Sequence, residues 1–485
     1  MSQLSKIKTQ KQEINISQIE GEDLVLFINA CFTCTGQREF YEDAHQQDLS
    51  IEFLHQYILG NYRRLYALTL ATGINHYNQA LIIFNLLSAG VPKHSSHKLE
   101  ESNLIRICLS EMPVNRVLKL FALLKKERVN NRRTRAVVKS YLNARKDPGF
   151  DAVKYRTKIK QALTHVHEKV EGERARFLFD STEAKSIPFE TSIFDSFQRA
   201  KYSKQAVYEL PFTVAESFAE RHSIPRDVFL KGIEGQLTKN EKLRLQKAAA
   251  REKQVKIDVD FGKLDLTRLV LYWLSLGYEK QVEMKDKFEM ALETQAESLL
   301  KGTQVTKDKI ALVVDRSFSM WGSKEKKRRP LAIGFAVHQI LKRAAKMYNV
   351  FWSSPLKQDL HLQPKGQSNI AEPFIEALKK EPDMVLIISD GFENDPVGLT
   401  SHIYQSWLKI QKGKANTSIV HLNPVYDANS FNVKGLGGGI TSVGIRNAED
   451  IAITLEYCRF ADGRATIDFL ENYVYQKYME KLANG

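Results

Sequence analysis

The sequence has no long apolar run and little cysteine. No stretch of about 18 uncharged apolar residues occurs, so we expect no membrane-spanning helix. The opening residues, MSQLSKIKTQKQEINISQ, are polar and have no apolar segment of the kind that a secretory signal contains. Four cysteines in 485 residues do not make a disulfide framework. We therefore expect a cytoplasmic protein in a reducing compartment.

The motifs of common enzymes and zinc sites are also missing. Cys31 and Cys34 form one C-x-x-C pair without a second pair, so we interpret them as small buried residues rather than zinc ligands or a redox centre. The twelve histidines show no metal-binding spacing, and His165 and His167 cannot face one way on a helix. The glycine-rich segment 435–442 lacks the lysine of a phosphate-binding loop. Because no Ser/His/Asp set is evident either, we expect no enzymatic activity.

Positive charge is concentrated in one segment of the chain. The net charge is +14, and residues 125–169 hold 14 Lys or Arg against 4 Asp or Glu, a local excess of +10. Such a concentration is typical of a protein that binds a polyanion, and a solvated helix face is the alternative. The candidate RNA-binding residues are Lys125, Lys126, Arg128, Arg132, Arg133, Arg135, Lys139, Arg145, Lys146, Lys154, Arg156, Lys158 and Lys160. We expect Arg132, Arg133, Arg135 and Lys139 to share much of one helix face.

The pattern of apolar residues changes near residue 304. Before it, segments of about 12 residues with helical periodicity follow one another with short breaks, which predicts an irregular α-helical solenoid over 1–304. After it, short apolar runs alternate with helical segments, which predicts βαβ units and a doubly wound parallel sheet over 305–485. The expected strands are 309–314, 349–354, 383–391, 417–424 and 440–445, and the expected helices are 329–348, 369–380, 399–411 and 447–460.

Short oxygen-bearing side chains follow two of the expected strands. Asp315 comes directly after the strand 309–314, and Asp390 lies at the end of the strand in 383–391. Ligands of open parallel sheets bind at the carboxyl ends of the strands, and residues two apart in an extended stretch point the same way. Such hard oxygens suit Mg²⁺ or another divalent cation, partly through water. We therefore expect a metal site formed by Asp315, Ser317, Ser319, Ser368 and Asp390; the alternative is that Ser317 and Ser319 only cap a helix.

These elements resemble a known domain family. D-x-S-x-S after the first strand, G-x-S before a later helix and S-D-G after the next strand are similar to the metal-ion-dependent adhesion site of von Willebrand factor A domains. That family usually has threonine where this chain has Ser368. A helical half followed by such a domain resembles the TROVE family of Ro autoantigen proteins, as do the segments NACFTCTGQREFYED (29–43), LSEMPVNRVLKLF (109–121) and ELPFTVAESFAERHSIP (209–225).

The resemblance implies an RNA-binding scaffold. Ro-type proteins form a ring of HEAT-like helical pairs closed by the A domain, bind small structured noncoding RNAs on a basic outer surface, and take single-stranded 3′ ends into the hole. A ring closed within one chain implies a compact monomer, and the lack of a long apolar run predicts no membrane partner. The alternative is a protein-interaction scaffold, in which the A domain docks a partner carboxylate through Mg²⁺ and RNA plays no role. A metal-dependent phosphodiesterase is disfavoured, because the sequence offers no second carboxylate-rich metal site.

Overall fold

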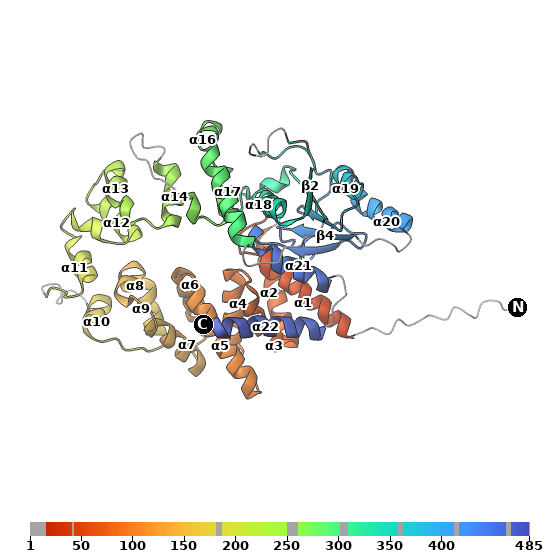
Figure 1. The fold of residues 1–485 in the computed structure, drawn as a ribbon. Helices are drawn as coiled ribbons and strands as arrows, with labels where there is room; N and C mark the ends of the chain where they lie inside the picture. Colours follow the sequence, from red (N-terminus) through yellow and green to blue (C-terminus); the bar gives the residue numbers. More distant parts are fainter. Residues whose placement is uncertain are drawn as a thin grey trace.

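The helices of the first 300 residues are arranged along an arc, and both ends of the arc lie beside a parallel sheet (Figure 1). The computed structural model describes residues 16–40, 43–180, 187–249, 260–300, 309–356, 360, 362–411, 417–461 and 467–484. Within these ranges, no helix combines the length and the apolar character that crossing a bilayer requires. The predicted combination of a helical solenoid and a parallel α/β sheet is confirmed.

The described part of the chain before residue 301 is built from α-helices and short 3₁₀ segments. Helix α6 (Val114–Lys126) illustrates why they form: Val117, Phe121 and Leu124 recur at three- and four-residue spacing and are buried on one side. The helix ends before Arg128, which has a φ of 56°. The other helices are α1 (Ile16–Thr33), α2 (Ala44–Asn61), α3 (Arg63–Leu68), α4 (His76–Ser88), α5 (Ser95–Glu111), α7 (Arg132–Asn143), α8 (Pro148–Lys154), α9 (Arg156–His165), α10 (Gly172–Phe179), α11 (Ser192–Arg199), α12 (Phe212–Arg221), α13 (Arg226–Ile233), α14 (Lys239–Ala249), α15 (Leu266–Trp273), α16 (Tyr278–Glu283) and α17 (Lys285–Leu300).

The first helices stack in two rows. Helices α3, α5 and α7 contact one another in sequence, and so do α4, α6 and α9. In Figure 1, α4 and α6 lie toward the inside of the arc and α5 and α7 toward the outside. Alternate helices therefore fall in the inner or the outer row, as in a helical solenoid.

A five-stranded parallel sheet follows, in the order β2-β1-β3-β4-β5. Side chains alternate between its two faces: Ile310, Leu312 and Val314 of β1 join the larger core, whereas Ala311 and Val313 face a second, smaller core. The sheet is therefore covered on both sides. Its elements are β1 (Lys309–Val314), α18 (Arg329–Ala344), β2 (Met347–Trp352), α19 (Ala371–Leu378), β3 (Met384–Ile388), α20 (Leu399–Gln411), β4 (Ser418–Asn423), β5 (Thr441–Gly444), α21 (Ile451–Ala461) and α22 (Ile467–Asn484).

Both ends of the helical part contact the sheet part, so the chain closes on itself. Helix α1 packs against β5, α21 and α22, while α15 and α17 pack against α18. At β5, the Gly444 amide donates to Asn29 Oδ1 over 3.1 Å. Nearby, Lys326 forms a buried ion pair with Glu39. Closure therefore involves both polar and apolar contacts.

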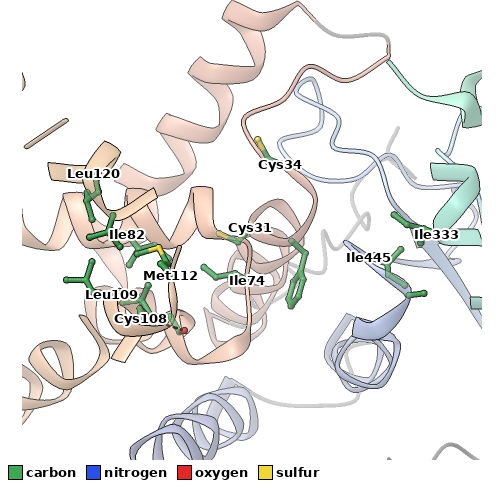
Figure 2. Packing of buried hydrophobic residues seen from close by; sticks show 14 of the residues in the cluster. Cys31, Cys34, Ile74, Ile82, Cys108, Leu109, Met112, Leu120, Ile333 and Ile445 are labelled. Carbon is green, nitrogen blue, oxygen red and sulfur yellow. Dashed lines mark hydrogen bonds between the residues drawn. The ribbon is translucent and has the colours of Figure 1, made fainter. Parts of the chain in front are cut away.

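One apolar core runs through both parts of the molecule. Cys31 and Ile74 of the helical part belong to the same buried cluster as Ile333 and Ile445 of the sheet part (Figure 2). The C-terminal helix α22 crosses back and packs on α1, α3 and α5. The two parts are distinct in secondary structure and continuous in their core.

Two details differ from the sequence-based expectation. The helix predicted over 329–348 ends at Ala344. Met347 already pairs with Lys309 of β1, so the backbone from Met347 onward forms the hydrogen bonds of a strand rather than those of a helix. Helix α22 was not predicted at all. The expected boundary at residue 304 lies outside the described residues, and the other predicted strands and helices of the sheet part are confirmed within a few residues.

A substitution at Gly444 tests how closely strand β5 packs against helix α1. A Cβ at this position would lie 2.9 Å from the Asn29 carbonyl oxygen and 2.9 Å from Thr33 Cγ2. We expect Gly444→Ala to lower the free energy of unfolding by about 1–3 kcal/mol, because helix α1 must move away. The control is Gly60→Ala in α2, where the added Cβ meets nothing within 4 Å. Equal urea midpoints for Gly444→Ala and the parent would contradict this close packing.

Candidate metal site and basic cluster

The two predicted aspartates leave neighbouring strands at one edge of the sheet. Asp315 follows β1 and Asp390 lies two residues after β3, and the Asp315 amide still donates to the Ile388 carbonyl oxygen over 2.8 Å. In the order β2-β1-β3, the chain changes direction of winding between β1 and β3. Such a switch point opens a crevice at the carboxyl ends of the strands, which is where ligands of these sheets bind.

Hydroxyl groups converge on Asp315 from two segments. Ser368 Oγ donates to Asp315 Oδ2 over 2.7 Å, and Ser317 Oγ donates to the same oxygen over 3.1 Å. The hydroxyls of Ser317 and Ser319 lie 3.1 Å apart, and Ser319 also hydrogen bonds to Asp390. The structure therefore brings all five predicted side chains together, and all of them are buried.

The site holds two carboxylates without a positive partner. Burial raises the pKa of Asp315, although the surrounding hydroxyls lower it. Burial and the negative charge of Asp315 raise the pKa of Asp390 to about 7. Neither carboxylate forms an ion pair within the described ranges, and the Arg316 guanidinium turns away to donate to the Gln363 and Pro355 carbonyl oxygens. Two buried carboxylates with neutral hydroxyls fit a hard divalent cation.

The local geometry differs from the extended stretch that we expected. The 3₁₀ helix η6 (Ser319–Trp321) begins inside the motif, and the Ser317 amide donates to Asp315 Oδ1 over 2.8 Å, so a turn rather than strand alternation gathers the hydroxyls. No side chain caps η6, so helix capping does not explain the two serines. Sequence reasoning missed Ser353, which donates to Asp315 Oδ1 over 3.1 Å. The feature that could have identified Ser353 is its position directly after the strand β2, as for Asp315 after β1.

The basic segment 125–169 does not form one open surface. Arg133 reaches Glu101 over 2.8 Å and is largely buried, because it lies on a different side of α7 from Arg132. Its removal would disturb a buried ion pair. The expectation that Arg133 shares a face with its neighbours is therefore wrong.

Other members of the segment also have partners inside the protein. Lys139 pairs with Glu168, Arg145 with Asp151 and Lys154 with Glu241. Arg135 donates to the Asn130 carbonyl oxygen, and Arg156 donates to the Phe177 carbonyl oxygen and lies over its ring. Lys158 is half-buried. The exposed candidate RNA-binding residues are Lys125, Lys126, Arg128, Arg132, Lys146 and Lys160.

A second basic cluster gathers around His76, and sequence reasoning missed it. Partial burial lowers the pKa of His76, and the positive charges of Arg446, Arg116 and Arg268 lower it further, whereas the negative charge of Glu111 raises it. These groups come from the starts of α4 and α6, from α15, and from the segment after β5. No local pattern could have joined them, because only closure of the chain brings them together.

The cluster is open to solvent and only partly neutralised. His76, Arg116 and Arg268 are exposed. Arg446 pairs with Asp450 over 2.8 Å, and Arg268 with Asp265 over 3.3 Å. The Arg268 pair is exposed and contributes little. Arg446, in contrast, donates two hydrogen bonds to the buried Asp450 and lies over the Phe32 ring. Guanidinium groups suit a phosphate because their fork of N–H donors matches its oxygens.

No family model matches the sequence, and no curated protein matches it either. The fold is similar to that of the Deinococcus radiodurans RO (RSR) protein. Its crystal structure covers 91% of this chain and is itself covered completely, at 12% sequence identity and a TM-score of 0.49.

Asp315 tests the metal site. We expect Asp315→Ala to abolish binding of Mg²⁺ and Mn²⁺ in calorimetry, because it removes the carboxylate on which the hydroxyls converge. The protein should remain folded by circular dichroism, since the change also removes one of two like charges buried together. Asp468→Ala, on the exposed face of α22, is the control. Unchanged binding in the Asp315 variant would contradict the assignment.

Proposed function

We propose that this protein is an RNA-binding scaffold with a divalent-cation site in its sheet part. The observation that carries the RNA proposal is that Arg116, Arg268 and Arg446 all lie near enough to His76 to lower its pKa. Such groups bind phosphates without reading bases. The cluster therefore fits a single-stranded RNA segment of many sequences.

The position of the cluster favours a strand that touches both parts of the molecule. Arg116 belongs to the inner row of helices, whereas Arg446 follows the last strand of the sheet. Arg329 fixes the latter segment by donating to the Arg446 carbonyl oxygen over 3.1 Å and to Asn447 Oδ1 over 2.7 Å. A bound phosphate would therefore bridge elements that are already held rigidly.

The exposed basic residues of the segment 125–169 provide a second surface. Lys125 and Lys126 end α6, Arg128 lies in the following turn, and Arg132 begins α7. These side chains face solvent, as do Lys146 and Lys160. We propose that they contact the backbone of a small structured noncoding RNA, whose identity the contacts do not specify.

The cation site adds a further binding function. Asp315, Ser317, Ser319, Ser368 and Asp390 would hold Mg²⁺ or another divalent cation, directly or through water. Bound there, the cation supplies a Lewis acid that accepts a carboxylate or phosphate oxygen of a partner. The exposed ring of Phe318, between two of the site serines, favours a protein partner as a second candidate function.

Two further properties follow from the same structure. We propose a reducing, cytoplasmic setting, which suits the free and buried thiols of Cys31, Cys34 and Cys108. We also propose that the protein acts as a monomer, because the arc closes within one chain.

Arginine substitution tests the RNA proposal. We expect Arg116→Gln/Arg268→Gln to weaken binding of single-stranded RNA in filter assays and to flatten the slope of log K against log salt by about 1.4, or about 0.7 per lost phosphate contact. The matched control is Lys342→Gln/Lys346→Gln, which removes the same charge from exposed positions of the sheet part. If both variants bind with the same slope as the parent, the protein-scaffold function becomes the better account.

The pH dependence of RNA binding tests the role of His76. Its pKa is lowered in the free protein, and a bound phosphate would raise it by favouring the charged imidazole. Binding then takes up a proton, so the affinity should rise as pH falls through the pKa of the complex, level off below the pKa of the free protein, and be lost as pH rises through the pKa of the complex. Each unit of pKa rise corresponds to a factor of about 10 in affinity. A His76→Gln variant that keeps the full pH dependence would contradict this role.

A further inference from the structure

Helix α2 is apolar on two sides. One side carries Ile51, Leu54 and Ile58, which are buried. The other side presents Leu49 and Phe53 to solvent, with exposed fractions of 54% and 58%. Tyr57 continues the row at 38% exposure. The spacing of four residues places these three side chains in one stripe along the helix.

The aromatic stripe, defined as Leu49, Phe53, Tyr57 and Phe431, crosses onto the sheet part. The Phe431 ring lies 5.6 Å from that of Phe53, centroid to centroid, and Phe53 lies 6.2 Å from Tyr57. Phe431 has a φ of 52°, a conformation that costs free energy in a residue with a bulky side chain. Its ring is nevertheless 38% exposed. The stripe thus lies over the seam between the two parts, and its side chains are exposed to solvent.

The surroundings of the stripe are acidic. Helix α2 contains no Lys or Arg, in a chain that has 71 of them. Asp48 and Glu52 are exposed on one flank. On the other flank, Asp23 of α1 accepts a hydrogen bond from the Tyr57 hydroxyl over 2.6 Å. An occupant of the stripe should therefore combine apolar and positively charged side chains.

The residues before α1 have this composition. The sequence MSQLSKIKTQKQEIN contains Leu4 and Ile7 together with Lys6, Lys8 and Lys11. Fifteen residues span up to about 50 Å when extended. Asp23 lies seven residues into α1, or about 10 Å along the helix axis. The segment is therefore long enough to reach every residue of the stripe.

We propose that residues 1–15 dock on the aromatic stripe of the same molecule. Leu4 and Ile7 cover the exposed rings, and the lysines face Asp48 and Glu52. A covalent tether gives the segment a local concentration on the order of millimolar, which favours it over a second copy or another protein at ordinary concentrations. The docked segment would tie α1 and α2 to the segment 427–432.

Photo-crosslinking of the full chain tests the proposal. The photoreactive amino acid p-benzoylphenylalanine replaces Phe53, whose exposed ring tolerates the larger group. After irradiation, we expect crosslinks to residues 4–11 in a species of monomer size, with a yield that does not change on tenfold dilution. The same amino acid at Leu49 provides a second, independent probe. Crosslinks to a second copy, crosslinks to another protein, or no crosslink from either position to residues 1–15 would each overturn the proposal.

Charge variants separate docking from chance contact. Lys6→Glu/Lys8→Glu/Lys11→Glu should lower the crosslink yield severalfold, and Asp48→Lys/Glu52→Lys in the same chain should restore it. The control Lys342→Glu/Lys346→Glu/Lys380→Glu changes the net charge equally on the exposed surface of the sheet part. A yield that falls equally in the control, or that the double change does not restore, would contradict charge-directed docking.

Discussion

The contact between helix α1 and the last strand is the constraint on which the rest of the structure depends. At Gly444 there is no room for a side chain, since a Cβ would lie 2.9 Å from the Asn29 carbonyl oxygen. The strand edge and the helix therefore meet backbone to backbone. The buried pair of Lys326 and Glu39 holds the same seam, although burial raises the pKa of Glu39 despite its partner. If the helical arc ended elsewhere, the packed face of α1 and the edge of β5 would both be exposed to solvent.

Closure creates the basic cluster. Arg446 lies two residues after Gly444 and reaches the region of His76 only because the strand before it is docked on α1. The candidate cation site, in contrast, needs only the sheet: Asp315 and Asp390 leave adjacent strands at the switch point. One candidate site thus depends on the local fold, and the other depends on the closed shape of the chain.

A site formed by the local fold can be predicted from the sequence, whereas a site formed only by closure of the chain cannot. Asp315 and Asp390 were found because each follows its own strand, and the motif around them is local. Ser353 was missed although it directly follows a strand, and the basic cluster had no local signal, because residues 76, 116, 268 and 446 meet only through tertiary packing. The number of basic residues of the segment 125–169 that are free to bind RNA was overestimated for the same reason. Counting charges does not reveal ion-pair partners such as Glu101 and Glu241, which are distant in sequence.

We propose that RNA binds where the two parts of the molecule meet. The most direct measurement is crosslinking of single-stranded RNA that contains 4-thiouridine, followed by mass spectrometry of the modified peptides. We predict nucleotide adducts on peptides from the starts of α4 and α6 and from the segment after β5. Adducts confined to residues 125–160, or the absence of adducts at saturating RNA, would contradict it.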